Sequence, residues 1–194
     1  MDVKDAMIPE DLRGLWEKLK SLHHALRDTT WKTYRRVNPF VENLFAWKEK
    51  GDFFGGKNVT IYDSTTVIGD VKIGDDTWVG AFCSLGGAGG ITIGRNCSIS
   101  TGVQVLTHSA VNWALSGGKM PYENRPVVIG DCCFIGVHAV IMPGTTIGSH
   151  CLVGAGAVVT HDVPDRTIVA GVPARPIGRV IEQADGQVRL EYDR

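Results

Sequence analysis

An aliphatic residue recurs at every sixth position through the middle of the chain, and this period restricts the fold more than any other feature. The series slips by two residues at Ile93 and restarts at Ile129 after an interruption. A helix would show a period of 3.6 residues and a simple strand a period of two. A period of six with glycine-rich corners predicts short strands joined by tight turns, three to a coil, with coils stacked at the strand spacing of ~4.8 Å. The fifteen positions are Ile61, Val67, Ile73, Val79, Leu85, Ile91, Ile93, Ile99, Val105, Ile129, Ile135, Ile141, Ile147, Val153 and Val159.

The same register accounts for most of the cysteines. Cys83, Cys97, Cys133 and Cys151 each stand two residues before an aliphatic position. That slot is predicted to face the narrow interior of the coil, where a thiol acts as a small hydrophobic group. Cys132 is out of register and is expected to face outward. Five cysteines are an odd number, and a Cys-Cys pair lacks metal-ligand spacing, so neither a disulfide framework nor a metal site is predicted.

Two less regular regions flank the repeats. Residues 9–27 have helical periodicity, with Pro9 at the start and leucines on one face, and a second short helix is expected over Phe40–Lys48. The chain is therefore divided into an N-terminal helical segment (1–56), a repeat region (57–165) and a C-terminal tail (166–194). The predicted fold class is all-β, a parallel β-helix with a helical N-terminal segment and a short tail.

Charge and hydropathy exclude several function classes. The 20 Lys and Arg residues balance 21 Asp and Glu, for a net charge of −1, which argues against a generally basic nucleic-acid binder. No apolar run approaches the roughly 18–20 residues needed to cross a bilayer, and the N-terminus has no signal-peptide apolar core. We expect a cytoplasmic protein without membrane insertion.

A long interruption of the repeats is the main candidate for a functional segment. The period stops after Val105 and resumes at Ile129, leaving a loop over about 107–127 that opens with His108. Long loops on rigid scaffolds often carry function. The loop also offers an aromatic and hydrogen-bonding set suited to a sugar, and we select four of its residues as candidate sugar contacts. These are Asn112, Trp113, Tyr122 and Glu123.

The repeats, the segment VVIGDCCFIGVHAVIMPGTTIGSHCLVGAGAVVTHDVP (127–164) and the closing IVAGVPARPIGRV (168–180) resemble the hexapeptide-repeat acyltransferases. They look most like the sugar O-acetyltransferases of the galactoside and maltose type and their polysaccharide-decorating relatives. The resemblance covers about residues 57–180. It implies a left-handed parallel β-helix, a homotrimer with active sites between subunits, and acetyl-CoA as the acetyl donor.

The resemblance also implies roles for particular residues. His108 matches the family's general base, and a base is needed because a sugar hydroxyl is a poor nucleophile near neutral pH. The GVPAR turn (171–175) matches the family's closing motif. Val137 stands where relatives often carry a polar residue, so only its backbone is expected to bind, and Arg179 is displaced by one place from the basic residue of several relatives. The coenzyme A contacts implied are Phe134, Gly136, Val137, Ala155, Thr160, His161, Arg175 and Arg179.

Other functions stay open at this point. An N-acetyltransferase acting on a nucleotide-linked amino sugar would have the same coil, and a non-catalytic structural β-helix is a second alternative. The γ-type carbonic anhydrases share the fold and bind zinc through three histidines. They would need one histidine about two coils before a closely spaced pair, and His108, His138, His150 and His161 do not have that spacing. No metal site is therefore predicted.

Overall fold

The computed structural model describes residues 8–35, 50–183 and 185–193. The chain divides into two compact units, Met1–Ala46 and Trp47–Arg194. The N-terminal unit contains a 3-10 turn, η1 (Glu10–Leu12), and the helix α2 (Arg13–Tyr34). The predicted N-terminal helix is confirmed, but it continues past residue 27 because no glycine or proline interrupts residues 28–34. It ends at Arg35, whose left-handed backbone (φ 54°) lets its amide bond to the Trp31 carbonyl.

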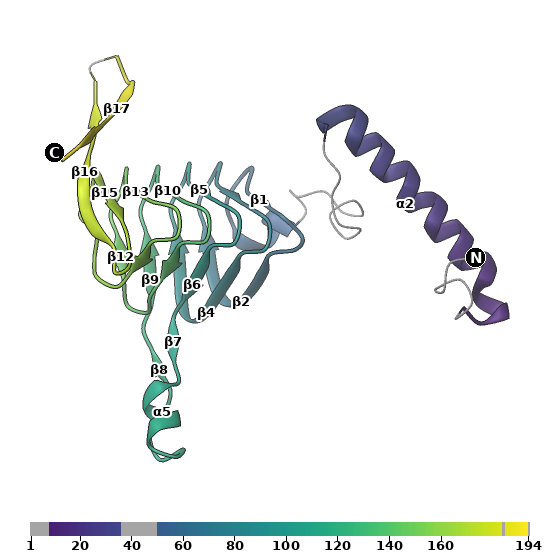
Figure 1. Ribbon diagram of the computed structural model, residues 1–194, viewed down its shortest axis with the longest axis horizontal. Coiled ribbons are helices and arrows are strands. Elements are labelled where there is room, and N and C mark those ends of the chain that lie inside the picture. Colours follow the sequence, from purple (N-terminus) through teal and green to yellow (C-terminus); the bar gives the residue numbers. More distant parts are fainter. Residues whose placement is uncertain (1–7, 36–49, 184, 194) are drawn as a thin grey trace. The chain divides into compact units, whose positions relative to one another are not determined.

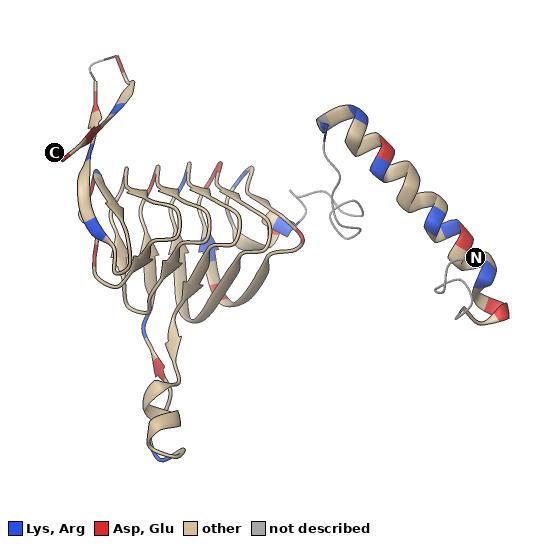
Figure 2. Ribbon diagram, viewed as in Figure 1, with Lys and Arg blue, Asp and Glu red and all other residues tan. Residues whose placement is uncertain are grey.

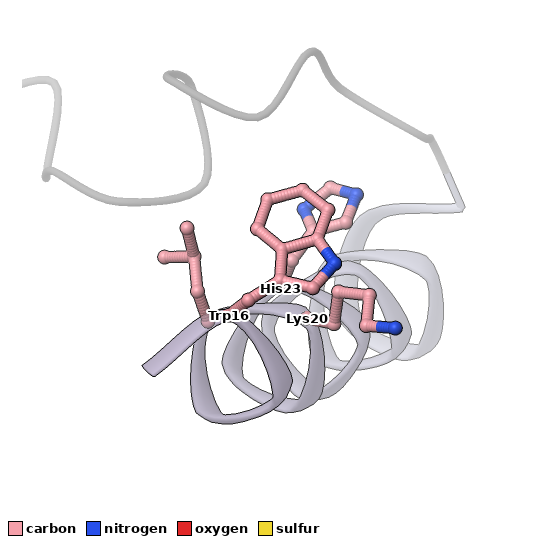
Figure 3. Close-up of a pocket in the computed structure, with 4 residues that line it drawn as sticks. Trp16, Lys20 and His23 are labelled. Atoms are coloured by element: carbon pink, nitrogen blue, oxygen red, sulfur yellow. The ribbon is translucent and has the colours of Figure 1, made fainter. Parts of the chain in front are cut away.

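Helix α2 carries leucines on one face, and Leu15 is 65% exposed. Trp16, Leu19, Lys20 and His23 line a pocket of about 140 Å³ on this face (Figure 3). The Lys20 ammonium lies 5.8 Å from the centre of the Trp16 ring. The second predicted helix, Phe40–Lys48, lies outside the described residues. Among the helices of the described ranges, none is long and apolar enough to cross a membrane.

The second unit is a parallel β-helix with three faces, as the six-residue period predicts (Figure 1). Each face is a stack of parallel strands, one from each coil. Two longer strands, β2 (Thr66–Ile73) and β4 (Ser84–Ile93), turn the corner between the second and third faces. The first face contains β1 (Thr60–Ile61), β3 (Trp78–Val79), β5 (Ser98–Ile99), β10 (Phe134–Ile135), β13 (Leu152–Val153) and β15 (Thr167–Ala170). The second face adds β6 (Gln104–Leu106), β11 (Val140–Ile141) and β14 (Val158–Val159), and the third adds β9 (Val127–Ile129) and β12 (Thr146–Ile147).

The core is the interior of this coil. Of the fifteen aliphatic positions of the repeat, all are buried except Val67, which is half-buried in the first coil and packs against the core. Cys83, Cys97, Cys133 and Cys151 are buried at 2% exposure each, whereas Cys132 is exposed, so the predicted orientation of all five cysteines is confirmed. Stacked aliphatic rows of this kind supply the apolar burial that holds adjacent coils together.

The two-residue slip in the repeat is a corner insertion. Ile91 and Ile93 both point inward, and Ile93 pairs with Ile73 of the preceding coil and Ile129 of the next, so the register is restored at Ile93. The extra residues lie in the glycine-rich turn before Ile91, where Gly90 has φ 93°. A residue with a Cβ is strained at such an angle, which explains the glycine there.

Different elements flank the coil at its two ends. A 3-10 turn, η2 (Asp52–Phe54), precedes the first coil. At the other end, β16 (Arg175–Glu182) pairs antiparallel with β15, and β17 (Val188–Tyr192) pairs antiparallel with β16. The predicted tail is therefore a hairpin that extends the first face (Figure 1). Charged residues are sparse on the faces of the coil and more frequent at its turns and on this hairpin (Figure 2).

Candidate active site

A protruding arm, residues 107–126, leaves the coil between β6 and β9, at the corner between the second and third faces (Figure 1). We call this edge of the coil the arm corner. Thr107 fixes the arm to it: the buried hydroxyl donates to the Gly86 carbonyl at 2.5 Å and accepts from the Gly89 amide at 2.7 Å. The Arg125 amide donates to the Thr107 carbonyl at 2.8 Å, so the two ends of the arm meet.

His108 is the first residue beyond this anchor. It begins β7 (His108–Ser109), which pairs antiparallel with β8 (Glu123–Asn124) to form a two-stranded ribbon. The His108 side chain is exposed. A short paired ribbon beside a fully bonded anchor presents this imidazole to solvent from a defined backbone position, as a base for a diffusing substrate requires.

The outer part of the arm contains the four predicted acceptor residues, and the structure pairs them with one another. The Asn112 amide, in the short helix α5 (Val111–Leu115), donates to the Glu123 carboxylate. The Trp113 and Tyr122 rings stack at 5.4 Å with an interplanar angle of 25°. Both rings keep about half of their surface exposed, at 42% and 54%. These contacts hold the arm together and leave a composite aromatic surface on it.

Further residues align along the arm corner in the two following coils. Because β6, β11 and β14 stack in parallel register, the residues that follow them occupy the same corner. The Arg125 side chain lies along Gly144 of the next coil. A Cβ added to Gly144 would come within 3.3 Å of the arginine Cβ and Cδ. In the coil after that, Thr160 Oγ1 lies 2.9 Å from His161 Nδ1. The backbones of Thr107 and His161, each two residues after a paired valine, are thus about two strand spacings apart, or ~10 Å, and His108 is the next residue along the arm.

The GVPAR turn brings Arg175 to this corner. It crosses the outer edge of β14, where the Val158 amide donates to the Gly171 carbonyl and the Ala174 amide donates to the Val158 carbonyl. A pocket of about 260 Å³ lies beside it and is lined by both His161 and Arg175. The structure therefore brings together two predicted coenzyme A contacts, His161 and Arg175, that are fourteen positions apart in the sequence.

Gly136, Val137 and Ala155 lie at the corner between the first and second faces, across the second face from His161. A Cβ on Gly136 would lie 2.6 Å from the Ala155 amide nitrogen, so glycine is required for the two coils to stack. The Val137 carbonyl accepts from the Gly156 amide at 2.8 Å, and the Val137 side chain is 44% exposed. The second face at β11 and β14 is thus bordered by predicted contacts on both sides.

Phe134 and Arg179 are not brought to this region. Phe134 points outward from the first face into a separate pocket of about 350 Å³, which Leu190 of the C-terminal hairpin also lines. Arg179 is in β16, opposite Glu191 of β17. The strand alternation of the first face would have indicated the position of Phe134, because the residue directly before each buried aliphatic residue points outward.

Three thiols of the coil, those of Cys132, Cys83 and Cys133, are poorly suited to nucleophilic catalysis because their pKa values are raised. Partial burial, and then the neighbouring Asp131 carboxylate, raise the pKa of Cys132, which keeps this exposed thiol protonated. Burial raises the pKa of Cys83, and contact with the thiols of Cys151 and Cys97 raises that of Cys133. Within the described residues, no group of three or more His, Cys, Asp or Glu side chains is placed to hold a metal ion.

Sequence reasoning missed two features of the arm. The first is Thr107, which anchors the arm. It lies two residues after the inward-facing Val105, so strand alternation indicates that its side chain also points inward. The pairing of β7 with β8 sets Asn124 opposite His108, and no short-range pattern in the sequence indicates this register.

Two family models match the coil. The model described as bacterial transferase hexapeptide (six repeats) matches residues 126–161, and the hexapeptide repeat of succinyl-transferase matches residues 70–107. Among curated proteins, the galactoside O-acetyltransferase of Escherichia coli (strain K12) is 32% identical over 128 residues. That match spans 56% of this chain and 63% of the relative, so the chain spans less than two thirds of the relative's length.

Solved structures match more of the chain. A hexapeptide-repeat acetyltransferase from Vibrio cholerae O1 biovar eltor, complexed with acetyl coenzyme A, has a TM-score of 0.63 and 27% identity. The match covers 84% of this chain and 87% of that one. AntD, an N-acyltransferase from Bacillus cereus in complex with dTDP and 3-hydroxybutyryl-CoA, has a TM-score of 0.57 and 25% identity. It covers 70% of this chain and 88% of its own.

Proposed function

The chain is a member of the hexapeptide-repeat acyltransferase family, and we propose that it transfers an acetyl group from acetyl-CoA to a hydroxyl of a saccharide. The observation that carries the proposal is the arm corner. It presents an exposed histidine, His108, two coils from a pocket lined by His161 and Arg175. The galactoside O-acetyltransferase and the acetyl-CoA complex of the similar acetyltransferase support the donor and the acceptor class.

His108 acts in this proposal as the general base of a direct transfer. Its imidazole removes the proton of the acceptor hydroxyl while the hydroxyl oxygen attacks the thioester carbonyl carbon. The carbon–sulfur bond then breaks, and the thiolate of coenzyme A leaves and takes up a proton. No acyl-enzyme forms, because the raised pKa of Cys132 disfavours the thiolate that would have to attack.

The coenzyme occupies the second face at β11 and β14. Gly136, Val137 and Ala155 border this face on one side. Small side chains and backbone groups there let the extended pantetheine chain of coenzyme A approach closely. Thr160 and His161 border it on the other. The Arg175 guanidinium, exposed beside the pocket of about 260 Å³, meets the phosphates, to which arginine donates in pairs.

Three subunits complete the sites. A single chain leaves the arm apolar on its surface, with Leu115 85% exposed and Val111 59% exposed. In a homotrimer the arm of one subunit covers these groups against the coil of the next, so that each active site lies between two subunits. Because acetyl-CoA is the donor, we place the reaction in the cytoplasm. The resemblance of the repeats to polysaccharide-decorating relatives supports a role in the synthesis of a surface polysaccharide.

Acylation of an amino group is the second candidate. AntD, which resembles this chain over most of the coil, is an N-acyltransferase and was solved with dTDP. A nucleotide-linked amino sugar therefore belongs in any acceptor screen. The stacked Trp113 and Tyr122 rings present an aromatic surface that suits a sugar ring in either case.

The test is a screen of the purified full-length protein with acetyl-CoA. Free thiol is measured against neutral sugars, amino sugars, nucleotide-linked amino sugars and serine, and mass spectrometry locates the acetyl group on oxygen or nitrogen. His108→Ala should lower kcat roughly 10²–10⁴-fold with little change in acetyl-CoA affinity. His24→Ala, an exposed histidine on α2, is the control and should keep wild-type kcat. An active His108→Ala enzyme would remove the assignment of the base.

A further inference from the structure

The register of the arm ribbon places Asn124 directly opposite His108. In an antiparallel pair, opposed residues project their side chains to the same face. The Arg125 amide bonds to the Thr107 carbonyl, so the residues between these two, His108 and Asn124, form the non-hydrogen-bonded kind of pair. That is the closer kind, with Cβ atoms ~4.5–5.5 Å apart. An asparagine side chain at this distance reaches an imidazole.

The two residues that follow this pair along the ribbon are already engaged. Ser109 Oγ accepts from the Val111 amide at 3.3 Å, and the Glu123 carboxylate accepts from Asn112. The His108 and Asn124 side chains are both exposed, and within the described residues neither makes a side-chain hydrogen bond, to the other or to a third group. The ribbon thus uses one cross-strand pair to hold the arm together and leaves the other available for chemistry.

We propose that Asn124 is a positioning residue for the histidine base. A rotation of these exposed side chains lets its amide oxygen accept a hydrogen bond from the Nδ1–H of His108, which fixes the tautomer and leaves the Nε2 lone pair facing the acceptor hydroxyl. The inference rests on the proposed function, in which His108 is the base. A neutral amide orients the ring without adding a charge, whereas a carboxylate at the same place would favour the imidazolium form and leave less of the ring neutral and able to accept a proton.

The other charged groups of the ribbon do not replace this contact. Glu123 is on the opposite ribbon face, since neighbouring residues of a strand alternate, and it is bonded to Asn112. Arg125 also alternates away from the His108 face and lies along Gly144 of the next coil. Within the described arm, Asn124 is the residue whose backbone position matches that of His108.

The experiment uses the full-length protein and two asparagine positions. Asn124→Ala and Asn124→Asp are compared with Asn96→Ala and Asn96→Asp, because Asn96 is an exposed asparagine at a turn away from the arm. The ¹⁵N chemical shifts of the His108 ring report its tautomer and its titration in the free protein, with no need for activity. Steady-state kinetics with the best acceptor from the screen, saturating in acetyl-CoA, report kcat.

We expect Asn124→Ala to reduce the Nδ1–H tautomer of His108 and to lower kcat roughly tenfold, the value of one net hydrogen bond, with an unchanged KM for acetyl-CoA. Asn124→Asp should raise the midpoint of the His108 titration by about one pH unit, because an opposite charge within ~4–6 Å favours the charged ring. The acid limb of kcat should move with it. Neither Asn96 variant should change these quantities.

A His108 ring whose tautomer and titration are the same in wild type and both Asn124 variants would overturn the proposal. A loss of kcat in Asn124→Ala without any change in the ring would also overturn it, since Asn124 would then act by another route. If the wild-type protein transfers no acetyl group, the proposed function fails, and the ring spectra still decide whether the two side chains are paired.

Discussion

Replacing Thr107 by valine should loosen the arm from the coil and destabilise the protein. Valine preserves the shape of the side chain and removes the hydroxyl, which is fully buried and makes two hydrogen bonds, at 2.5 Å to the Gly86 carbonyl and at 2.7 Å from the Gly89 amide. Both backbone groups then lose their partner. An orphaned buried polar group costs about 1–3 kcal/mol, so we expect the free energy of unfolding to fall by roughly 2 kcal/mol or more.

The assay is urea unfolding followed by circular dichroism, at equal protein concentrations for all variants. Thr107→Ser is the matched control, because it keeps both hydrogen bonds and loses one methyl group, at about 1 kcal/mol. Hydrogen exchange gives a local readout: in Thr107→Val the Gly89 and Arg125 amides should exchange faster, whereas amides of β1 should not change. A Thr107→Val protein as stable as wild type, with slow exchange at Gly89, would refute the anchoring role.

Three further variants test the coenzyme site and the mechanism. Arg175→Ala should weaken binding of coenzyme A more than binding of dephospho-coenzyme A in calorimetry if the guanidinium meets the 3′-phosphate, and equal losses would place it elsewhere. Gly136→Ala should lower the urea midpoint by the equivalent of about 1–3 kcal/mol, because its Cβ would lie 2.6 Å from the Ala155 amide nitrogen. The control is Gly14→Ala in helix α2, where a Cβ meets nothing within 4 Å, and this variant should not destabilise the protein. Cys132→Ser should keep wild-type kcat and intersecting initial-rate plots, and an acetyl group found on Cys132 of the wild type by mass spectrometry would refute direct transfer.

The coil could be predicted because its physics is local and repeated. Each inward position meets the same kind of neighbour one coil above and below, so a single rule of size and polarity applies to all of them. The four interior cysteines follow that rule, and Cys132 departs from it in the sequence and in the structure alike. The interruption after Val105 also follows directly from the loss of period.

The arm could be located from the sequence, but its interior could not. Its residues are held by pairings between side chains nine or more positions apart, such as Trp113 with Tyr122, and no period relates them. Helix α2 is longer than its periodicity predicts, because the residues after 27 lack a continuous apolar face, yet none of them stops a helix before Arg35. Family likeness places Phe134 and Gly136 in one site, although Phe134 lies on a face of the coil and Gly136 at a corner.

The GVPAR turn has a consequence for the behaviour of the protein in solution. A β-helix ends in exposed strand edges, and such an edge is a template on which other chains can add strands and aggregate. Here the turn satisfies the backbone of Val158 at the end of the second face, through the Gly171 carbonyl and the Ala174 amide. The first face instead ends in β17, whose Arg189 and Glu191 place charges along its edge. The segment that brings Arg175 to the pocket thus also protects the C-terminal end of the coil against the addition of strands from other chains.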